Sequence, residues 1–388
     1  MKHLLLGTAA IALGLAFAAP AAKAADGVKL DVGGYFKGYV TWHDQDEITP
    51  DASDARSFDI LRDTEIHFTG ETTLDNGLTV GFHTEELADP GDGFDVQESY
   101  AYFSGGWGRV NFGAEDGAAY LLQVAAPAAD TNVDGLRQYI QPVNYAIARA
   151  PYNLIAAVPL TIFKGDYAQD ATGYYDKITY LSPVFSGFQV GLSYTPDVLN
   201  YAANASRGIA GVTLDNVENS YGAAWEGSAR YEGQFQNLDI TLGGGYTHVN
   251  LEKDAVAPGT LDDRKVWNVG GNLGWSAFNL GAAYKHDNYG LDNNGSERTW
   301  VVGVDYTTGP YKLGASYADR KNELASAAIF GPGTPDLDSK RYSGGVGYTY
   351  GPGMTFRGSV HYINHDDNTA ADGDMSATSV LLGTQINF

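Results

Sequence analysis

Alternation of apolar and polar residues, repeated over most of the chain, constrains the fold more than any other feature of this sequence. In segment 29–42 the apolar residues share one face: Leu30, Val32, Phe36, Val40 and Trp42. In segment 376–388 the corresponding face carries Val380, Leu382, Thr384, Ile386 and Phe388. Because successive side chains of a strand point to opposite sides, a period of two predicts β-strands with two unlike faces.

Sixteen segments follow this pattern, and the links between them alternate between short and long. The segments are 29–42, 58–72, 78–86, 97–104, 109–113, 176–182, 188–195, 220–232, 238–250, 265–276, 279–286, 297–307, 311–318, 340–350, 355–364 and 376–388. The alternation is typical of an antiparallel up-and-down barrel with short periplasmic turns and long extracellular loops. We therefore predict an all-β, transmembrane β-barrel of about 16 strands, with both ends of the sheet on the periplasmic side.

A soluble β-sandwich has the same period, so composition is needed to separate the two folds. The chain has no cysteine, and glycine accounts for 49 of its 388 residues. An exported chain without disulfides is held together by backbone pairing and packing, and a closed barrel pairs every strand on both sides. Trp267 and Trp275 share one face and lie about 20 Å apart along the membrane normal, close to the spacing of two aromatic girdles.

The polar faces carry charge deep within the strands, as the wall of a water-filled lumen does. These residues are Lys37, Asp63, Glu65, His67, Glu71, His83, Glu85, Glu98, Glu226, Arg230, Asp239, Lys285, Asp305, Lys312, Arg341, Arg357 and His361. Arg62 breaks the pattern, because strict alternation directs it toward lipid. We predict a bulge near 60–62 or a strand end there.

Residues 1–24 are predicted to be a cleaved signal peptide. A basic start at Lys2 precedes an uncharged apolar run at 4–18, and Ala22-Lys23-Ala24 fits a small-x-small cleavage site. The run is shorter than the roughly 20 residues of a membrane-spanning helix. Residues 25–388 are then predicted to form one barrel domain.

The charge is strongly acidic, at −23 with 24 Lys and Arg against 47 Asp and Glu. This balance argues against nucleic acid as a partner and favours cations as permeants.

Four stretches make the sequence similar to the Gram-negative general porins, the sixteen-stranded trimeric kind. They are Leu74-Asp75-Asn76-Gly77-Leu78, residues 98–113, residues 176–194 and the terminal Phe388. The resemblance implies an outer-membrane channel, and not an enzyme, for passive diffusion of small hydrophilic solutes and ions. It also implies a homotrimer in contact with outer-membrane lipid and lipopolysaccharide.

The resemblance further implies that segment 114–175 folds inward as a constriction loop. We assign the acidic side of the constriction to Glu115, Asp116, Asp130 and Asp134, and the basic wall to Lys37, Arg341 and Arg357. Opposed charges of this kind set up a field across the narrowest point of a pore. A weakly cation-selective pore is the resulting hypothesis.

Other functions stay open at this point. A solute-specific barrel, for example a sugar-selective one, would use a binding site in the constriction, with Tyr120, Tyr139, Tyr145 and Tyr152 as its aromatic track. An outer-membrane lipase or protease, or a secreted soluble β-domain, would share the strand pattern. No catalytic motif is found in the sequence, however.

Metal sites are weakly indicated. The eight histidines are scattered with no pair at metal-site spacing, so no metal ligand is assigned. The acidic stretches 366–368 and 372–374 are rich enough in oxygen to hold Ca²⁺ but lack the full EF-hand pattern. No other cofactor is expected.

Overall fold

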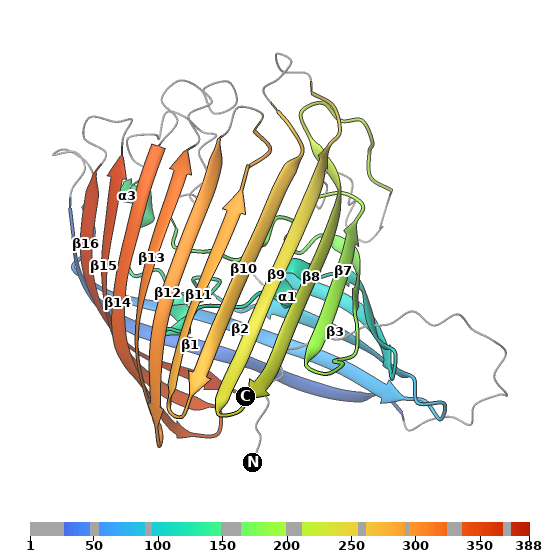
Figure 1. The fold of residues 1–388 in the computed structure, drawn as a ribbon, viewed down its shortest axis with the longest axis horizontal. Helices are drawn as coiled ribbons and strands as arrows, with labels where there is room; N and C mark the ends of the chain where they lie inside the picture. The colour runs from blue at the N-terminus through green and yellow to red at the C-terminus, as the bar shows by residue number, and fades with distance from the viewer. Residues whose placement is uncertain are drawn as a thin grey trace.

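The described part of the chain forms one closed antiparallel barrel (Figure 1). The computed structural model describes residues 27–46, 54–89, 95–148, 164–198, 212–254, 261–291, 295–323, 336–367 and 374–388. Sixteen strands lie within these ranges: β1 Lys29–Gln45, β2 Phe58–Thr73, β3 Thr79–Leu87, β4 Asp95–Gly105, β5 Gly108–Ala114, β6 Asp176–Leu181, β7 Phe188–Thr195, β8 Tyr221–Phe235, β9 Leu238–Leu251, β10 Arg264–Trp275, β11 Phe278–Asp287, β12 Ser296–Thr308, β13 Tyr311–Glu323, β14 Asp336–Gly351, β15 Met354–Asp367 and β16 Met375–Asn387. The predicted all-β barrel is confirmed, whereas the predicted signal peptide lies outside the described residues.

Each strand pairs with its neighbours in the chain, and β1 pairs with β16 to close the ring. The closing ladder is extended by reciprocal backbone hydrogen bonds between Gly34 and Phe388, at 3.0 and 3.1 Å. The start of β1 and the end of β16 lie at the same end of the barrel, as an even number of strands requires (Figure 1).

Most strands are longer than their apolar pattern predicts, and in β13 and β14 most of the extra residues lie toward the long loop between them. β13 continues to Glu323, five residues past the predicted end at 318, and β14 begins at Asp336 instead of 340. The added residues include Arg320 and Lys321, which are polar. Backbone pairing therefore continues beyond the height at which the outward face is apolar.

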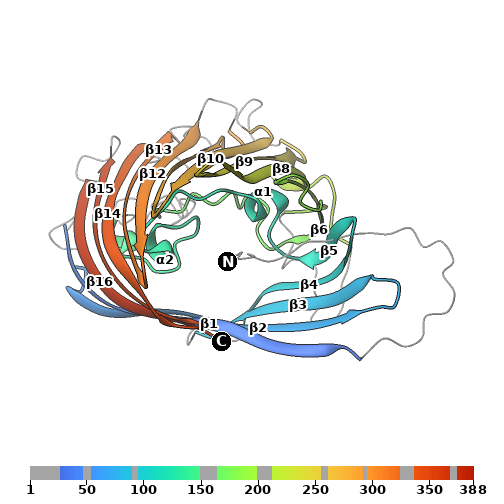
Figure 2. The ribbon, with the colours of Figure 1, turned by 60° about the horizontal axis from the view of Figure 1, so that its bottom comes forward.

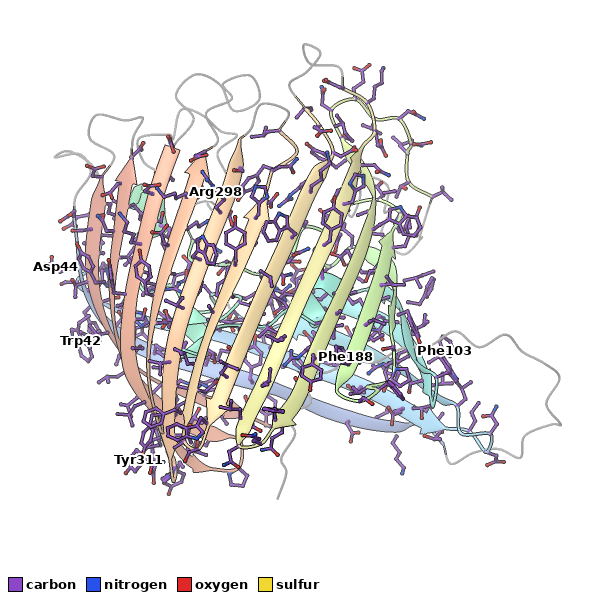
Figure 3. All side chains as sticks on the ribbon, viewed as in Figure 1. Trp42, Asp44, Phe103, Phe188, Arg298 and Tyr311 are labelled. Atoms are coloured by element: carbon purple, nitrogen blue, oxygen red, sulfur yellow. The ribbon has the colours of Figure 1, made fainter. Side chains whose placement is uncertain are left out.

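The two faces of the strands are those predicted from the sequence. On β1, Leu30, Val32 and Trp42 are exposed on the outside, while Lys37 and Tyr39 are buried inside. Aromatic pairs form two rows on the outer surface. One row includes Tyr194–Trp225, Trp267–Tyr284 and Tyr284–Trp300, and the other includes Phe188–Tyr231, Phe278–Tyr306 and Tyr311–Tyr348. In Figure 3, Phe188 and Tyr311 lie toward the lower ends of their strands and Arg298 toward the upper end.

Of the two alternatives predicted near Arg62, a bulge or a strand end, the bulge is wrong. The β1–β2 register runs without a shift from Lys29 opposite Glu71 to Trp42 opposite Phe58. The β2–β3 ladder, however, reaches only to Glu65, because β3 ends at Leu87. Arg62 thus lies on the outer face above the end of β3, where its guanidinium is 3.7 Å from the Asp89 carboxylate. A strand end beside β2 removes the need for a bulge in it.

The link after β2 shows how the chain makes its short turns. Leu74 donates its N–H to the carbonyl of Leu78 at 2.8 Å, and Gly77 donates to the carbonyl of Leu74 at 2.8 Å. Gly77 has a φ of +83°, which glycine adopts without a steric cost. The Asn76 side chain accepts the Leu78 N–H at 3.0 Å and completes the turn.

Three short helices follow β5: α1 Ala118–Leu121, α2 Thr131–Asp134 and α3 Tyr145–Ala148. Figure 2 shows α1 and α2 inside the ring of strands. Of the helices described, none is long and apolar enough to cross a membrane. We call residues 115–148 and 164–175 together the inward segment.

Candidate functional site

The first part of the inward segment, from α1 to Ala129, is held by small residues on the barrel wall. The backbone N–H of Ala118 donates to the Ser193 hydroxyl at 2.8 Å, and the Ser228 hydroxyl donates to the Ala118 carbonyl at 2.7 Å. Leu122 packs with Ala118 against Leu181 of β6 in a buried apolar cluster. This end of the segment is therefore bound to β6, β7 and β8.

Glycines beneath this part of the segment let its backbone approach the wall closely. A Cβ on Gly303 of β12 would overlap the carbonyl of Pro127, and a Cβ on Gly314 of β13 would lie 2.7 Å from the backbone nitrogen of Ala129. Any side chain at either position would push the segment inward. Part of the high glycine content thus provides room for the inward segment.

The second part of the segment, around α2, is held by charge. The buried carboxylate of Asp130 accepts hydrogen bonds from Arg357 of β15 at 2.9 Å and from the Tyr39 hydroxyl at 2.9 Å. Asp130 also caps α2 by accepting the Asn132 backbone N–H at 3.0 Å. One acid of the segment therefore binds both β1 and β15.

Asp134 forms a second buried pair, with Arg341 of β14. The guanidinium Nε lies 3.0 Å from the Asp134 carboxylate, and both side chains are at most 5% exposed. Ser343 donates to the same carboxylate at 2.9 Å, and His361 lies 3.4 Å from it. Arg341 also donates to the Val133 carbonyl at 3.3 Å. The pair is dry and shared among several polar groups, so it fixes α2 against β14 and β15.

Glu115 and Asp116 are buried where the segment leaves β5. Burial raises the pKa of the Glu115 carboxyl to about 8, although a hydrogen bond from Asn111 and the nearby Lys177 ammonium partly oppose the shift. Burial also raises the pKa of Asp116 to about 6, against the opposing effect of Arg137. Arg137 donates to the Asp116 carboxylate at 2.9 Å. These two acids therefore make buried contacts where the inward segment leaves the barrel wall.

Lys37, the remaining predicted wall residue, is buried on β1. Its ammonium pairs with Asp63 of β2 at 2.9 Å and lies 3.4 and 3.2 Å from the ring centres of Tyr35 and Tyr139. Of the predicted tyrosine track, Tyr145 is buried, Tyr120 stacks under the Arg137 guanidinium, and Tyr152 lies outside the described residues. Of the three described tyrosines, Tyr139 alone borders the cavity that is described next.

A cavity with a volume of about 570 Å³ lies beside the inward segment. Its wall combines three regions: the β2–β3 side, the inward segment, and the upper ends of β10, β11 and β13. The charged residues lining it are Asp63, Glu65, Asp89, Arg137, Lys164, Asp166, Asp170, Arg264, Lys285, Asp287 and Arg320. These are six carboxylates and five cations, which gives a lining charge of −1.

The lining charges are arranged by sign. The β2–β3 side contributes Asp63, Glu65 and Asp89, whereas β10, β11 and β13 contribute Arg264, Lys285 and Arg320. The positive charges of the basic side are largely neutralised by nearby carboxylates. Arg264 pairs with Asp287 at 2.5 Å, and Lys285 lies 3.2 Å from Glu297, which also binds Arg320. An acidic and a basic face thus oppose each other across the cavity.

None of the seven charges predicted for the constriction lines this cavity. The structure brings together Asp130 with Arg357 and Asp134 with Arg341, but as contact pairs in which each charge neutralises the other. Their role in selectivity stays a prediction. Sequence reasoning placed Lys285 on the lumen face but missed Arg264 and Arg320, which lie just outside the predicted strand segments 265–276 and 311–318.

The structure brings together two of the histidines that are scattered in the sequence. His67 of β2 lies with His83 and Glu85 of β3, and one ligating atom from each falls within 4.8 Å of the others. Spacing along the sequence does not reveal this set, because its members lie on two strands of a hairpin whose register is known only from the structure. The predicted Ca²⁺ stretches fall partly outside the described residues, since 368–373 are not described, and Ca²⁺ binding stays a prediction.

A family model described as Gram-negative porin matches residues 7–368 of the chain. Among curated proteins, an uncharacterized protein of Rickettsia felis is 23% identical over 290 residues, covering 68% of this chain and 61% of that protein. One of Rickettsia conorii is 21% identical over 302 residues, with 68% and 61% coverage. The chain thus spans about three fifths of the length of the curated relatives it matches.

Solved structures share the fold. An anion-selective porin from Comamonas acidovorans superposes with a TM-score of 0.61 at 16% identity, over 93% of this chain and 100% of that one. An outer membrane protein of Vibrio cholerae lacking loop L8 gives a TM-score of 0.57 at 15% identity, over 94% of this chain and 100% of that one. At these identities the likeness shows the architecture alone.

Proposed function

Since the chain belongs to the Gram-negative porin family, we propose that it forms a water-filled channel for passive diffusion of small hydrophilic solutes and ions across the bacterial outer membrane. The observation that carries the proposal is the lumen cavity of about 570 Å³, bounded by charged side chains of the barrel wall and of the inward segment. Charged groups around an aqueous passage favour hydrated permeants over apolar ones.

The inward segment narrows the channel in this proposal. Its two stretches of contact with the wall leave the lumen open mainly toward β2 and β3, where Asp63, Glu65 and Asp89 line the cavity. Asp63 and Asp89 have basic partners of their own, in Lys37 at 2.9 Å and Arg62 at 3.7 Å, so the charges of both sides are partly compensated. The net lining charge of −1 and the chain charge of −23 then favour cations weakly. We therefore propose a weak cation preference.

The test is single-channel conductance of purified, detergent-extracted protein in a planar bilayer under a KCl gradient. We expect stepwise openings and a reversal potential that favours K⁺. An anion-favouring reversal, as the name of the Comamonas relative would suggest, would keep the channel and overturn the cation preference. Folded protein that gives no openings would overturn the channel itself.

A solute-specific channel is the alternative function. Of the three described tyrosines of the predicted track, Tyr139 alone lines the cavity and Tyr145 is 2% exposed, which disfavours an aromatic path for sugars. Sugars added at millimolar concentration should leave the current unchanged in a general channel. Saturable block by one sugar would favour the alternative.

Assembly as a homotrimer in contact with lipid and lipopolysaccharide is part of the proposal. The outward faces of β1 and β16 meet at the closing seam and expose Leu30, Val32, Trp42 and Leu382. We propose this surface as the subunit contact. Leu30→Lys combined with Val32→Lys should convert cross-linked trimers to monomers on a gel, and an unchanged trimer would place the contact elsewhere.

A further inference from the structure

The lumen face of β2 and β3 carries a cluster that combines imidazoles with carboxylates. In the antiparallel register His67 lies opposite Glu85, and Thr69 lies opposite His83. All four residues share the inward phase of Glu65 and Asp63. Ligating atoms of His67, His83 and Glu85 lie within 4.8 Å of one another.

We propose that His67, His83 and Glu85 form a binding site for a divalent transition-metal ion of the Zn²⁺ type. The Nε2 atom of His83 is 2.8 Å from a carboxylate oxygen of Glu85, and Nδ1 of His67 is 3.8 Å from the same oxygen. Ligands bound at about 2.0–2.2 Å to one tetrahedral ion lie about 3.3–3.6 Å apart. Small side-chain rotations therefore bring the three atoms around a common ion.

The remaining ring nitrogens already have the partners that metal-bound imidazoles use. The Thr69 hydroxyl is 2.8 Å from Nδ1 of His83, and Glu65 is 3.2 Å from Nε2 of His67. With those nitrogens protonated, His83 presents Nε2 and His67 presents Nδ1 to the ion as free acceptors. A carboxylate behind a ligating histidine fixes its orientation and raises its basicity.

The ligand set and the exposure favour a transition metal over Ca²⁺ or Mg²⁺. Two imidazoles and one carboxylate suit Zn²⁺, Ni²⁺ or Cu²⁺, whereas the hard cations prefer oxygen ligands. The side chains of His67 and Glu85 are 26% and 21% exposed, so an ion reaches the site from the lumen and keeps a water as a fourth ligand. Glu98, opposite Glu85 on β4, adds negative charge nearby.

The site is connected to the inward segment through aromatic contacts. His67 packs edge-on against Tyr35 at 6.0 Å, and Tyr35 contacts Tyr139 of the inward segment at 6.2 Å. A bound ion would add two positive charges next to Glu65, which lines the cavity. Resting on the proposed channel function, this part of the inference predicts that micromolar Zn²⁺ lowers K⁺ preference.

The primary test is metal binding, which does not depend on channel activity. Untagged, detergent-purified protein is titrated with ZnCl₂ against a chromogenic Zn²⁺ indicator, and with Co²⁺ while visible absorption is followed. We expect one ion per chain and an intense tetrahedral Co²⁺ band. His67→Ala and His83→Ala should each weaken Zn²⁺ binding at least ~10-fold and abolish the band, and Glu65→Gln should weaken it ~10-fold through the lost support of His67.

His43→Ala is the matched control, because His43 is also on the lumen side of β1 but lies outside the cluster. It should bind Zn²⁺ as the parent protein does. Heat-modifiable gel migration of each variant checks that the barrel is folded. Unchanged Zn²⁺ affinity in folded His67→Ala and His83→Ala would overturn the site, as would displacement of Zn²⁺ by millimolar Ca²⁺. Zn²⁺ bound here without any channel current would leave the metal site standing and remove only the proposed channel.

Discussion

The inward segment is held to two stretches of the same barrel by different physical means. From α1 to Ala129 it lies on β6–β13 through glycines, alanines and backbone hydrogen bonds, with no charged partner among the contacts described above. Around α2 it is bound to β1, β14 and β15 through Asp130 with Arg357 and Asp134 with Arg341. The first attachment depends on available volume, and the second depends on paired charge.

The difference shows why acidic residues on an inward segment do not by themselves set selectivity. A carboxylate that touches a guanidinium in a dry contact is neutralised, and its field reaches the permeant only weakly. Asp130 and Asp134 are 1% exposed. Asp63 and Asp170 also have basic partners, but they border the cavity and their side chains are 14% and 34% exposed. We therefore expect anchoring and selectivity to depend on different acids.

The largest expected effect comes from breaking the charged attachment. Asp134→Asn leaves Arg341 buried without its counter-charge, which costs about 3–5 kcal/mol in comparable buried pairs. We expect α2 to detach part of the time, so that single-channel current fluctuates far more often while the reversal potential stays the same. Single-channel recording measures both quantities.

Asp305→Asn provides the control for that experiment. Asp305 is also a buried lumen acid with a basic partner, Lys312 at 3.0 Å, but it lies on the β12–β13 hairpin away from α2. In Asp305→Asn we expect the single-channel current to show no extra fluctuation. A changed reversal potential in Asp134→Asn, without extra fluctuation, would return Asp134 to the selectivity role that the sequence predicts.

A smaller effect is expected from filling the volume beneath the first attachment. Gly303→Ala places a methyl group against the Pro127 carbonyl, and overpacking of this kind costs about 1–3 kcal/mol. The segment should move toward the lumen, which lowers conductance without a change in reversal potential. Gly227→Ala is the control, since its Cβ would meet only Leu192 at 3.7 Å. Equal conductance in the two variants would show that the close approach does not limit the pore.

The sequence predicts the strands well because their information is local. All sixteen segments and both faces follow from a period of two, as Leu30 against Lys37 illustrates. The attachments of the segment could not be predicted, because the pairing of Asp134 with Arg341 depends on how a loop crosses a lumen. The His67, His83 and Glu85 cluster needed the hairpin register, which depends on the turn at 74–78.

Charges that line the cavity should shift selectivity and leave both attachments intact. Asp170→Asn and Lys164→Gln each remove one unit of charge from the same limb of the inward segment. The first should lower K⁺ preference and the second should raise it, each as a modest shift of the reversal potential in a KCl gradient. Shifts of the same sign would contradict an electrostatic origin of selectivity.

The smallest expected effect is a pH dependence at the base of the segment. Burial raises the pKa of Glu115 to about 8, above the value of 4.5 for a free glutamate, so the attached segment favours the protonated carboxyl. That stabilisation is complete below about pH 4 and is lost as the pH rises through 8, where the buried group must ionise in place. We expect hydrogen exchange at 115–121 to show greater protection at pH 5 than at pH 8.5, after correction for the intrinsic exchange rate.

Glu115→Gln should abolish that difference, because its amide resembles the neutral acid and does not titrate in this range. If the variant keeps the full pH dependence, Asp116, with a pKa raised to about 6, becomes the group responsible. The pH range over which protection changes then identifies the group. A change centred near pH 6 belongs to Asp116, and a change centred near pH 8 belongs to Glu115.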